Sequence, residues 1–108
     1  MSVTKDLFAL PKTKKLATAL VTIQDVSLMQ AFLRDIMTEK EITEFSNRLL
    51  AAEMLIAGNT YTDIAEVTQL SSRTIARISQ WIKTGKGGYA RVLTILEAHH
   101  GHILPTRD

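Results

Sequence analysis

The side chains best suited to specific chemistry lie between Ser71 and Arg77, where three of the seven residues carry hydroxyl groups and two are arginines. Hydroxyl and guanidinium groups donate hydrogen bonds to base edges and phosphates, and the planar fork of an arginine matches the acceptors of guanine. Arginine and short polar residues near the exposed start of a helix are typical of a helix that enters the major groove of DNA. The chemistry predicted is therefore recognition of DNA.

The sequence offers no arrangement typical of catalysis or metal binding. It contains no cysteine, and no Ser/His/Asp triad or pair of catalytic carboxylates is evident. The glycines between Gly85 and Gly88 lack the lysine–serine pattern that follows a phosphate-binding loop. His99, His100 and His102 lack the i, i+4 spacing and the acidic or cysteine partners of a helical metal site. We therefore predict no enzyme activity, no metal and no cofactor.

The segment from Thr60 to Trp81 has the pattern of a helix-turn-helix. Thr60 is suited to cap the first helix and Ser71 the second, with Thr68-Gln69-Leu70 as the turn. The residues predicted to face inward are Ile64, Ala65, Leu70, Ile75 and Ile78. Those predicted to lie on or near the outer face are Ser72, Arg73, Ala76, Arg77 and Gln80.

Gln69 departs from the usual pattern of this motif, which has glycine at that position of the turn. A left-handed backbone conformation there costs a residue with a side chain about 1–2 kcal/mol. A packed domain tolerates this cost, so the motif remains the prediction.

The polar residues of the motif form the candidate DNA-contacting set. Arg73 is the first candidate for a base contact, with a surface salt bridge to Glu66 as the alternative. Thr62 is a candidate phosphate contact on the first helix. The hydroxyls of Ser71, Ser72 and Thr74 are further candidates for contacts with bases or phosphates, although helix capping alone accounts for one of them. The complete set is Thr62, Ser71, Ser72, Arg73, Thr74, Ala76 and Arg77.

Basic residues outside the motif have two open interpretations. The cluster Lys12, Lys14 and Lys15 is either a phosphate-contacting arm or a solvated helix start. Near the glycine-rich joint, Lys83, Lys86 and Arg91 either contact phosphates or belong to a solvated surface.

Helical periodicity over the whole chain predicts six helices, no strand and one all-α domain spanning residues 1–108. Residues 1–12 are a short helix or a loose arm, and 101–108 are a tail. The next expected features are a helix at about 13–22, a helix capped by Asp25, and a long helix that starts at Glu39 and ends at Gly58. The helix-turn-helix and a last helix from Tyr89 to His100 complete the fold.

Composition sets broad limits on location and assembly. The formal net charge of +2 is only mildly basic, and no apolar run has membrane-spanning length. These features and the lack of cysteine predict a cytoplasmic protein without a membrane partner. Apolar residues cover much of the long helix, which indicates a helix at the centre of the fold or at a dimer interface.

With this order of helices, the chain resembles the tryptophan repressor superfamily, most of all its uncharacterised repressor-like branch. The resemblance covers about residues 13–97 and rests further on Arg48 of the long helix, on Arg77 of the motif and on Gly58-Asn-Thr-Tyr61. It implies an intertwined homodimer that places two DNA-binding heads on a palindromic operator. The implied function is that of a sequence-specific transcriptional regulator, expected to be a repressor.

The resemblance also implies a candidate effector pocket formed by Arg48, Arg77, Ile78 and Trp81. Amino-acid-binding members of the superfamily have glycine and serine where this chain has Ile78 and Trp81. Ile78 would crowd the slot and Trp81 would fill it from within the chain. The arginines would then stack on this indole or pair with Glu44 or Glu53. Tryptophan is therefore not the expected ligand, and another effector remains open.

A second function also remains open, that of a dimeric protein–protein adaptor that has lost DNA binding. It is favoured by the low net charge of +2 and by Gln69 in the turn.

Overall fold

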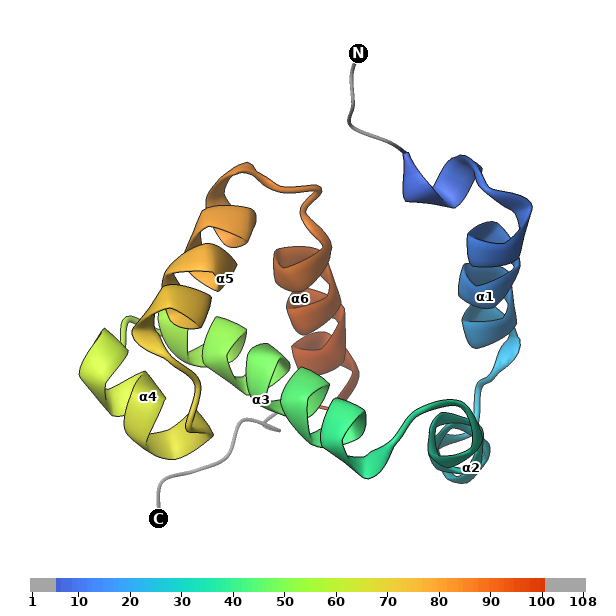
Figure 1. The fold of residues 1–108 in the computed structure, drawn as a ribbon, viewed down its shortest axis with the longest axis horizontal. Helices are drawn as coiled ribbons and strands as arrows, with labels where there is room; N and C mark the ends of the chain where they lie inside the picture. The colour runs from blue at the N-terminus through green and yellow to red at the C-terminus, as the bar shows by residue number, and fades with distance from the viewer. Residues whose placement is uncertain (1–5, 101–108) are drawn as a thin grey trace. The chain divides into compact units, whose positions relative to one another are not determined.

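The computed structural model describes the backbone of residues 6–100 and the side chains of residues 6–98. Within this range the chain forms a 3-10 helix and six α-helices and contains no strand (Figure 1), which confirms the all-α prediction. The tail 101–108 and the three histidine side chains lie outside the described residues. The elements are η1 (Leu7–Ala9), α1 (Pro11–Thr22), α2 (Val26–Ile36), α3 (Glu39–Ile56), α4 (Tyr61–Thr68), α5 (Ser72–Thr84) and α6 (Gly88–His100).

Helix α1 begins at Pro11, earlier than the predicted start near residue 13. Proline is favoured in the first turn because its missing N–H has no partner there in any case and its φ is already helical. The preceding Leu10 provides no side-chain cap, and the first turn contains no acidic residue. Lys12, Lys14 and Lys15 are exposed along the early turns of this helix.

The predicted starts of α2 and α3 are confirmed in atomic detail. The side chain of Asp25 accepts a hydrogen bond from the backbone N–H of Leu28 at 2.9 Å. Thr38 and Glu41 form the reciprocal capping box: the Thr38 N–H donates to Oε1 of Glu41 at 2.9 Å, and the Glu41 N–H donates to Oγ1 of Thr38 at 3.1 Å. These local bonds fix where both helices begin.

The chain divides into two compact units, Met1–Ile42 and Thr43–Asp108. In the first unit, α1 and α2 contain no buried residue, and apolar side chains such as Val21 and Val26 are largely exposed. These two helices are amphipathic without enclosing a core of their own.

The core of the second unit joins α3, α4 and α5, and α6 packs against it. Its fully buried residues are Ala51, Ala52, Ile64, Ile75 and Ile78. The two alanines of α3 are small, so the isoleucines of the other helices can approach its backbone closely. Tyr89 and Leu93 bring α6 onto the same cluster. This core holds the helix-turn-helix against the long helix.

One prediction concerns the pH dependence of stability. Burial raises the pKa of the Glu53 carboxyl above its ordinary value of 4.5, and the charge of Glu97 raises it further. The ionised form is thus less favourable in the folded chain than in the unfolded chain. The free energy of unfolding should fall as the pH rises from 4.5 through the raised folded-state pKa.

Glu53→Gln should remove this part of the pH dependence and stabilise the protein at neutral pH. Urea denaturation from acid to neutral pH measures both effects. Asp35→Asn removes an exposed carboxylate of α2 and serves as the control. Equal pH profiles for wild type and Glu53→Gln would contradict the prediction.

Candidate nucleic-acid interface

Helices α4 and α5 are joined by the three residues Gln69 to Ser71, as a helix-turn-helix requires. The side chain of Thr60 accepts from the N–H of Asp63 at 3.1 Å, and that of Ser71 accepts from the N–H of Thr74 at 3.1 Å. Both predicted caps are confirmed. Each satisfies a backbone donor that the helix itself leaves free and so fixes the first residue of its helix.

The side chains of Thr68 and Gln69 stabilise the turn, and Gln69 occupies the position where this motif usually has glycine. Gln69 has the expected left-handed conformation, with φ 63° and ψ 14°, and its Nε2 donates to the carbonyl of Glu66 at 2.9 Å. Thr68 is 1% exposed; its Oγ1 donates to the carbonyl of Ile64 at 2.7 Å and accepts from the N–H of Leu70 at 3.2 Å. Thr68 is therefore the buried last residue of α4 rather than part of the turn, and Leu70 is only partly buried.

The motif has a buried inner face and an exposed outer face, as predicted. Ile64, Ile75 and Ile78 are 0% exposed, and Ala65 is partly buried against them. The exposed set on the opposite side of α5 is Ser72, Arg73, Ala76, Arg77 and Gln80.

The hydroxyl groups at the start of α5 differ in their availability. Ser71 caps the helix and also donates from Oγ to Oγ1 of Thr74 at 3.1 Å. Thr74 is partly buried, whereas Ser72 is exposed. Ser72 is therefore the hydroxyl of this turn that is free to contact a ligand.

Charge is divided between the two helices of the motif. Helix α5 carries Arg73, Arg77 and Lys83 and no acidic residue, whereas α4 carries Asp63 and Glu66 and no basic residue. In the described part of the chain Arg73 forms no ion pair, so the salt bridge to Glu66 left open by the sequence is not formed. The guanidinium of Arg73 therefore remains accessible, and a polyanion would approach α5 in preference to α4.

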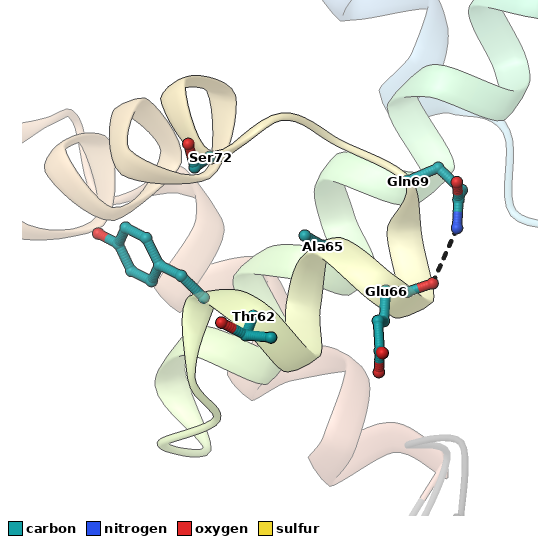
Figure 2. Close-up of a pocket in the computed structure, with 6 residues that line it drawn as sticks. Thr62, Ala65, Glu66, Gln69 and Ser72 are labelled. Atoms are coloured by element: carbon teal, nitrogen blue, oxygen red, sulfur yellow. Dashed lines mark hydrogen bonds between the residues drawn. The ribbon is translucent and has the colours of Figure 1, made fainter.

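An open hollow of about 480 Å³ lies between α4 and the start of α5 (Figure 2). Thr62, Ala65 and Glu66 follow one another along α4, with Gln69 at the helix end and Ser72 on the facing turn of α5. Tyr61 completes the lining. Thr62 was the α4 residue predicted as a DNA contact. The i, i+4 spacing of Thr62 and Glu66 indicates in the sequence that both residues share one face of α4. The position of Ser72 opposite that face depends on the fold of the turn, which the spacing does not specify.

The four residues of the candidate effector pocket lie in different surroundings. Ile78 is in the core, and Arg77 is exposed. Arg48 donates from Nη2 to Oε2 of Glu44 at 2.9 Å, one of the pairings left open by the sequence. Its Nε is buried without a hydrogen-bond partner within the described residues. Trp81 is 42% exposed, so its indole is not enclosed in this chain.

Trp81 lines a second, more apolar hollow of about 370 Å³ at the joint between α5 and α6. Leu49, Tyr89 and Val92 contribute to its walls, together with Lys86. Burial raises the pKa of Tyr89, and the nearby charge of Arg48 partly opposes this shift. The basic residues Lys83 and Arg91 are exposed on either side of this joint.

Comparison with known proteins relates this arrangement to a described family. The model of the Trp repressor protein family matches residues 12–97 of this chain. The uncharacterized protein YerC of Bacillus subtilis (strain 168) is 32% identical over 79 residues, which are 73% of this chain and 76% of that protein.

Solved structures agree with the family match. The crystal structure of a TrpR like protein from Eubacterium eligens ATCC 27750 has a TM-score of 0.81 at 30% identity, covering 94% of this chain and 100% of that one. A Staphylococcus aureus crystal structure has a TM-score of 0.80 at 26% identity, covering 89% of this chain and 96% of that one.

A prediction follows from the turn that orients α5. Gln69→Gly and Gln69→Ala both remove the hydrogen bond from Nε2 to the carbonyl of Glu66. Only glycine relieves the left-handed conformation, so the glycine variant should be more stable than the alanine variant by about 1 kcal/mol. Urea denaturation of the two variants measures this difference directly. An alanine variant as stable as the glycine variant would show that the conformation at position 69 is not strained.

Proposed function

Because this chain belongs to the Trp repressor protein family, we propose that it is a sequence-specific DNA-binding transcriptional regulator. We further propose that it acts as a repressor, as a homodimer on a palindromic operator. The observation that carries the proposal is the exposed first half of α5, which presents Ser72, Arg73 and Arg77 without an acidic neighbour on the same helix.

The chemistry of this face fits the major groove of DNA. Arg73 lies one residue after the start of α5, where the recognition helix of a helix-turn-helix meets base edges. Its unpaired guanidinium can form two hydrogen bonds with guanine. Arg77, one turn further along, is the candidate phosphate contact, and Thr62 on α4 is another. Phosphate contacts position the protein, and base contacts supply the sequence preference.

The apolar surface of the described residues supports the proposed dimer. Helices α1 and α2 have no buried residue, and side chains from both units remain exposed. In the most exposed large apolar residues, more than half of the maximum accessible surface is open to solvent; they include Val21, Val26, Val67, Ile95 and Phe8. Apolar surface of this extent is unfavourable in water and is commonly covered by a partner subunit. A two-fold dimer would also double the number of phosphate contacts, which a net charge of +2 alone does not supply.

The first test of this function is DNA binding by arginine variants. Arg73→Ala should weaken binding to the selected site by about 1–3 kcal/mol and relax the preference at one base pair, as expected for a base contact. Arg77→Ala should weaken binding to all sequences and reduce the slope of log affinity against log salt by about one. Fluorescence anisotropy with labelled duplexes over a salt series measures both effects.

Lys40→Ala, which removes one exposed positive charge outside the motif, is the matched control. It should change neither the base preference nor the salt slope. Unaltered binding by the double variant Arg73→Ala/Arg77→Ala would refute the proposed function.

The second test is the molecular mass in solution. The proposed homodimer has twice the chain mass of 12.0 kDa. Light scattering coupled to size-exclusion chromatography should report about this doubled mass at micromolar concentration. Val26→Lys or Ile95→Lys should shift the mass toward that of a single chain, since each places a charge on an exposed apolar position. A wild-type mass near 12.0 kDa would end the dimer proposal.

A protein–protein adaptor is the second candidate function. The acidic surface of α4, formed by Asp63 and Glu66, favours it, because this surface repels a DNA backbone. Affinity capture followed by mass spectrometry would support the adaptor if one stoichiometric protein were retained and duplex DNA were not retained at low salt. Retention of DNA fragments of a common sequence would exclude it as the main function.

A further inference from the structure

We propose that the hollow between α4 and α5 binds the exocyclic amino group of a base, with Glu66 as the residue that selects cytosine. This inference rests on the proposed DNA-binding function and adds a base preference that Arg73 does not provide. It assigns Glu66, one of the two acidic residues of α4, a role in specificity.

The position of the hollow places it next to the predicted base contacts. Ser72, the first residue of α5, lies across the hollow from Thr62 of α4, and Glu66 lines the hollow one turn further along α4 (Figure 2). Ser72 precedes Arg73 in the chain, so if the start of α5 enters the major groove, the hollow comes near the base pairs that Arg73 contacts. The hollow is open and has a volume of about 480 Å³, which leaves room for the edge of a base.

The hydrogen-bonding groups of the hollow include two acceptors that the fold leaves free. Within the described residues the carboxylate of Glu66 forms no ion pair. Nε2 of Gln69 donates to the carbonyl of Glu66, so the amide oxygen of Gln69 is the part of that side chain left to accept. No lysine or arginine lines the hollow. The carboxylate of Glu66 therefore repels a phosphate at its own position on α4, whereas an uncharged hydrogen-bond donor would be bound there.

Among the groups exposed in the major groove, the amino group of cytosine fits these acceptors best. Cytosine presents an N4 amino donor, and a carboxylate accepts from it. Adenine presents its amino donor beside the N7 acceptor, and a carboxylate placed against both groups would be repelled by N7. Guanine and thymine present acceptors at the corresponding edge. The carboxylate of Glu66 thus favours cytosine over the other three bases.

Glu66 also provides specificity by rejection. A carboxylate held close to a polyanion weakens binding to every sequence, because like charges repel. At a DNA site that places the amino group of cytosine opposite the carboxylate, the hydrogen bond offsets this repulsion. At other sites the repulsion is not offset. Specificity of this kind comes from a penalty on the wrong partner as much as from a contact with the right one.

Asp63 provides a matched control on the same helix. It is an exposed carboxylate of α4, like Glu66, but it does not line the hollow. Removing its charge should increase the affinity for all DNA sequences without altering the preferred base. A comparison of Asp63→Asn with Glu66 variants therefore separates the general effect of charge from the specific contact.

The experiment is selection of bound duplexes from a random library by the full chain and three variants. Wild type should enrich cytosine at one position next to the base pair contacted by Arg73. Glu66→Ala should lose this preference by about tenfold while the rest of the site is retained. Glu66→Gln should shift the preference to adenine, because a glutamine amide pairs with both N6 and N7 of that base. Asp63→Asn should enrich the wild-type site. Thermal unfolding followed by circular dichroism confirms that each variant is folded.

Failure of the inference and failure of the proposed function have different signatures. If wild type selects a site and Glu66→Ala selects the same site at every position, the inference is overturned and DNA binding stands. If Asp63→Asn also lost the preference for cytosine, the inference would be overturned, because the preference would then depend on the charge of α4 and not on a contact made by Glu66. If wild type enriches no sequence at any salt concentration, the proposed function and the inference fail together.

Discussion

The arrangement of the helix-turn-helix depends on one buried hydroxyl. Thr68 lies in a core from which water is excluded, and its Oγ1 pairs with the carbonyl of Ile64 and the N–H of Leu70. The carbonyl of Ile64 also accepts the helical bond from the Thr68 N–H, so the group that depends on this hydroxyl is the part-buried N–H of Leu70, and leaving it unpaired would cost about 1–3 kcal/mol. The two bonds therefore fix where α4 ends and where the chain turns. The start of α5 at Ser72, the burial of its isoleucines and the exposure of Arg73 all follow from that point.

Features determined by residues close in sequence were predictable. The caps at Asp25, Thr60 and Ser71 and the capping box at Thr38 depend on contacts over two or three residues, and each was found where expected. Two local features were misassigned. Pro11 opens α1 because proline is compatible with a first turn, and Thr68 is a core residue because backbone partners satisfy its hydroxyl. Polarity alone does not separate a turn threonine from a buried one.

The candidate site was only partly predictable, because its surfaces combine residues from two helices. The outward position of Arg73 follows from the helical period of the buried isoleucines. The hollow that Glu66 and Ser72 both line depends on the angle between α4 and α5, which no local pattern specifies. The exposure of Trp81 likewise depends on how α6 returns to α3 after the glycine joint. An indole expected to fill a slot is 42% exposed in the chain taken alone.

The uncapped, lysine-rich start of α1 has a consequence for how the protein responds to its ionic surroundings. Lys12, Lys14 and Lys15 lie at the positive end of the helix dipole, and Leu10 offers no compensating side chain. The positive charges of these lysines repel the positive end of the dipole. Dissolved anions screen this repulsion, so α1 becomes more stable as ionic strength rises. Electrostatic attraction between α5 and a polyanion becomes weaker under the same conditions. A rise in ionic strength thus stabilises α1 and weakens the attraction of α5 for a polyanion.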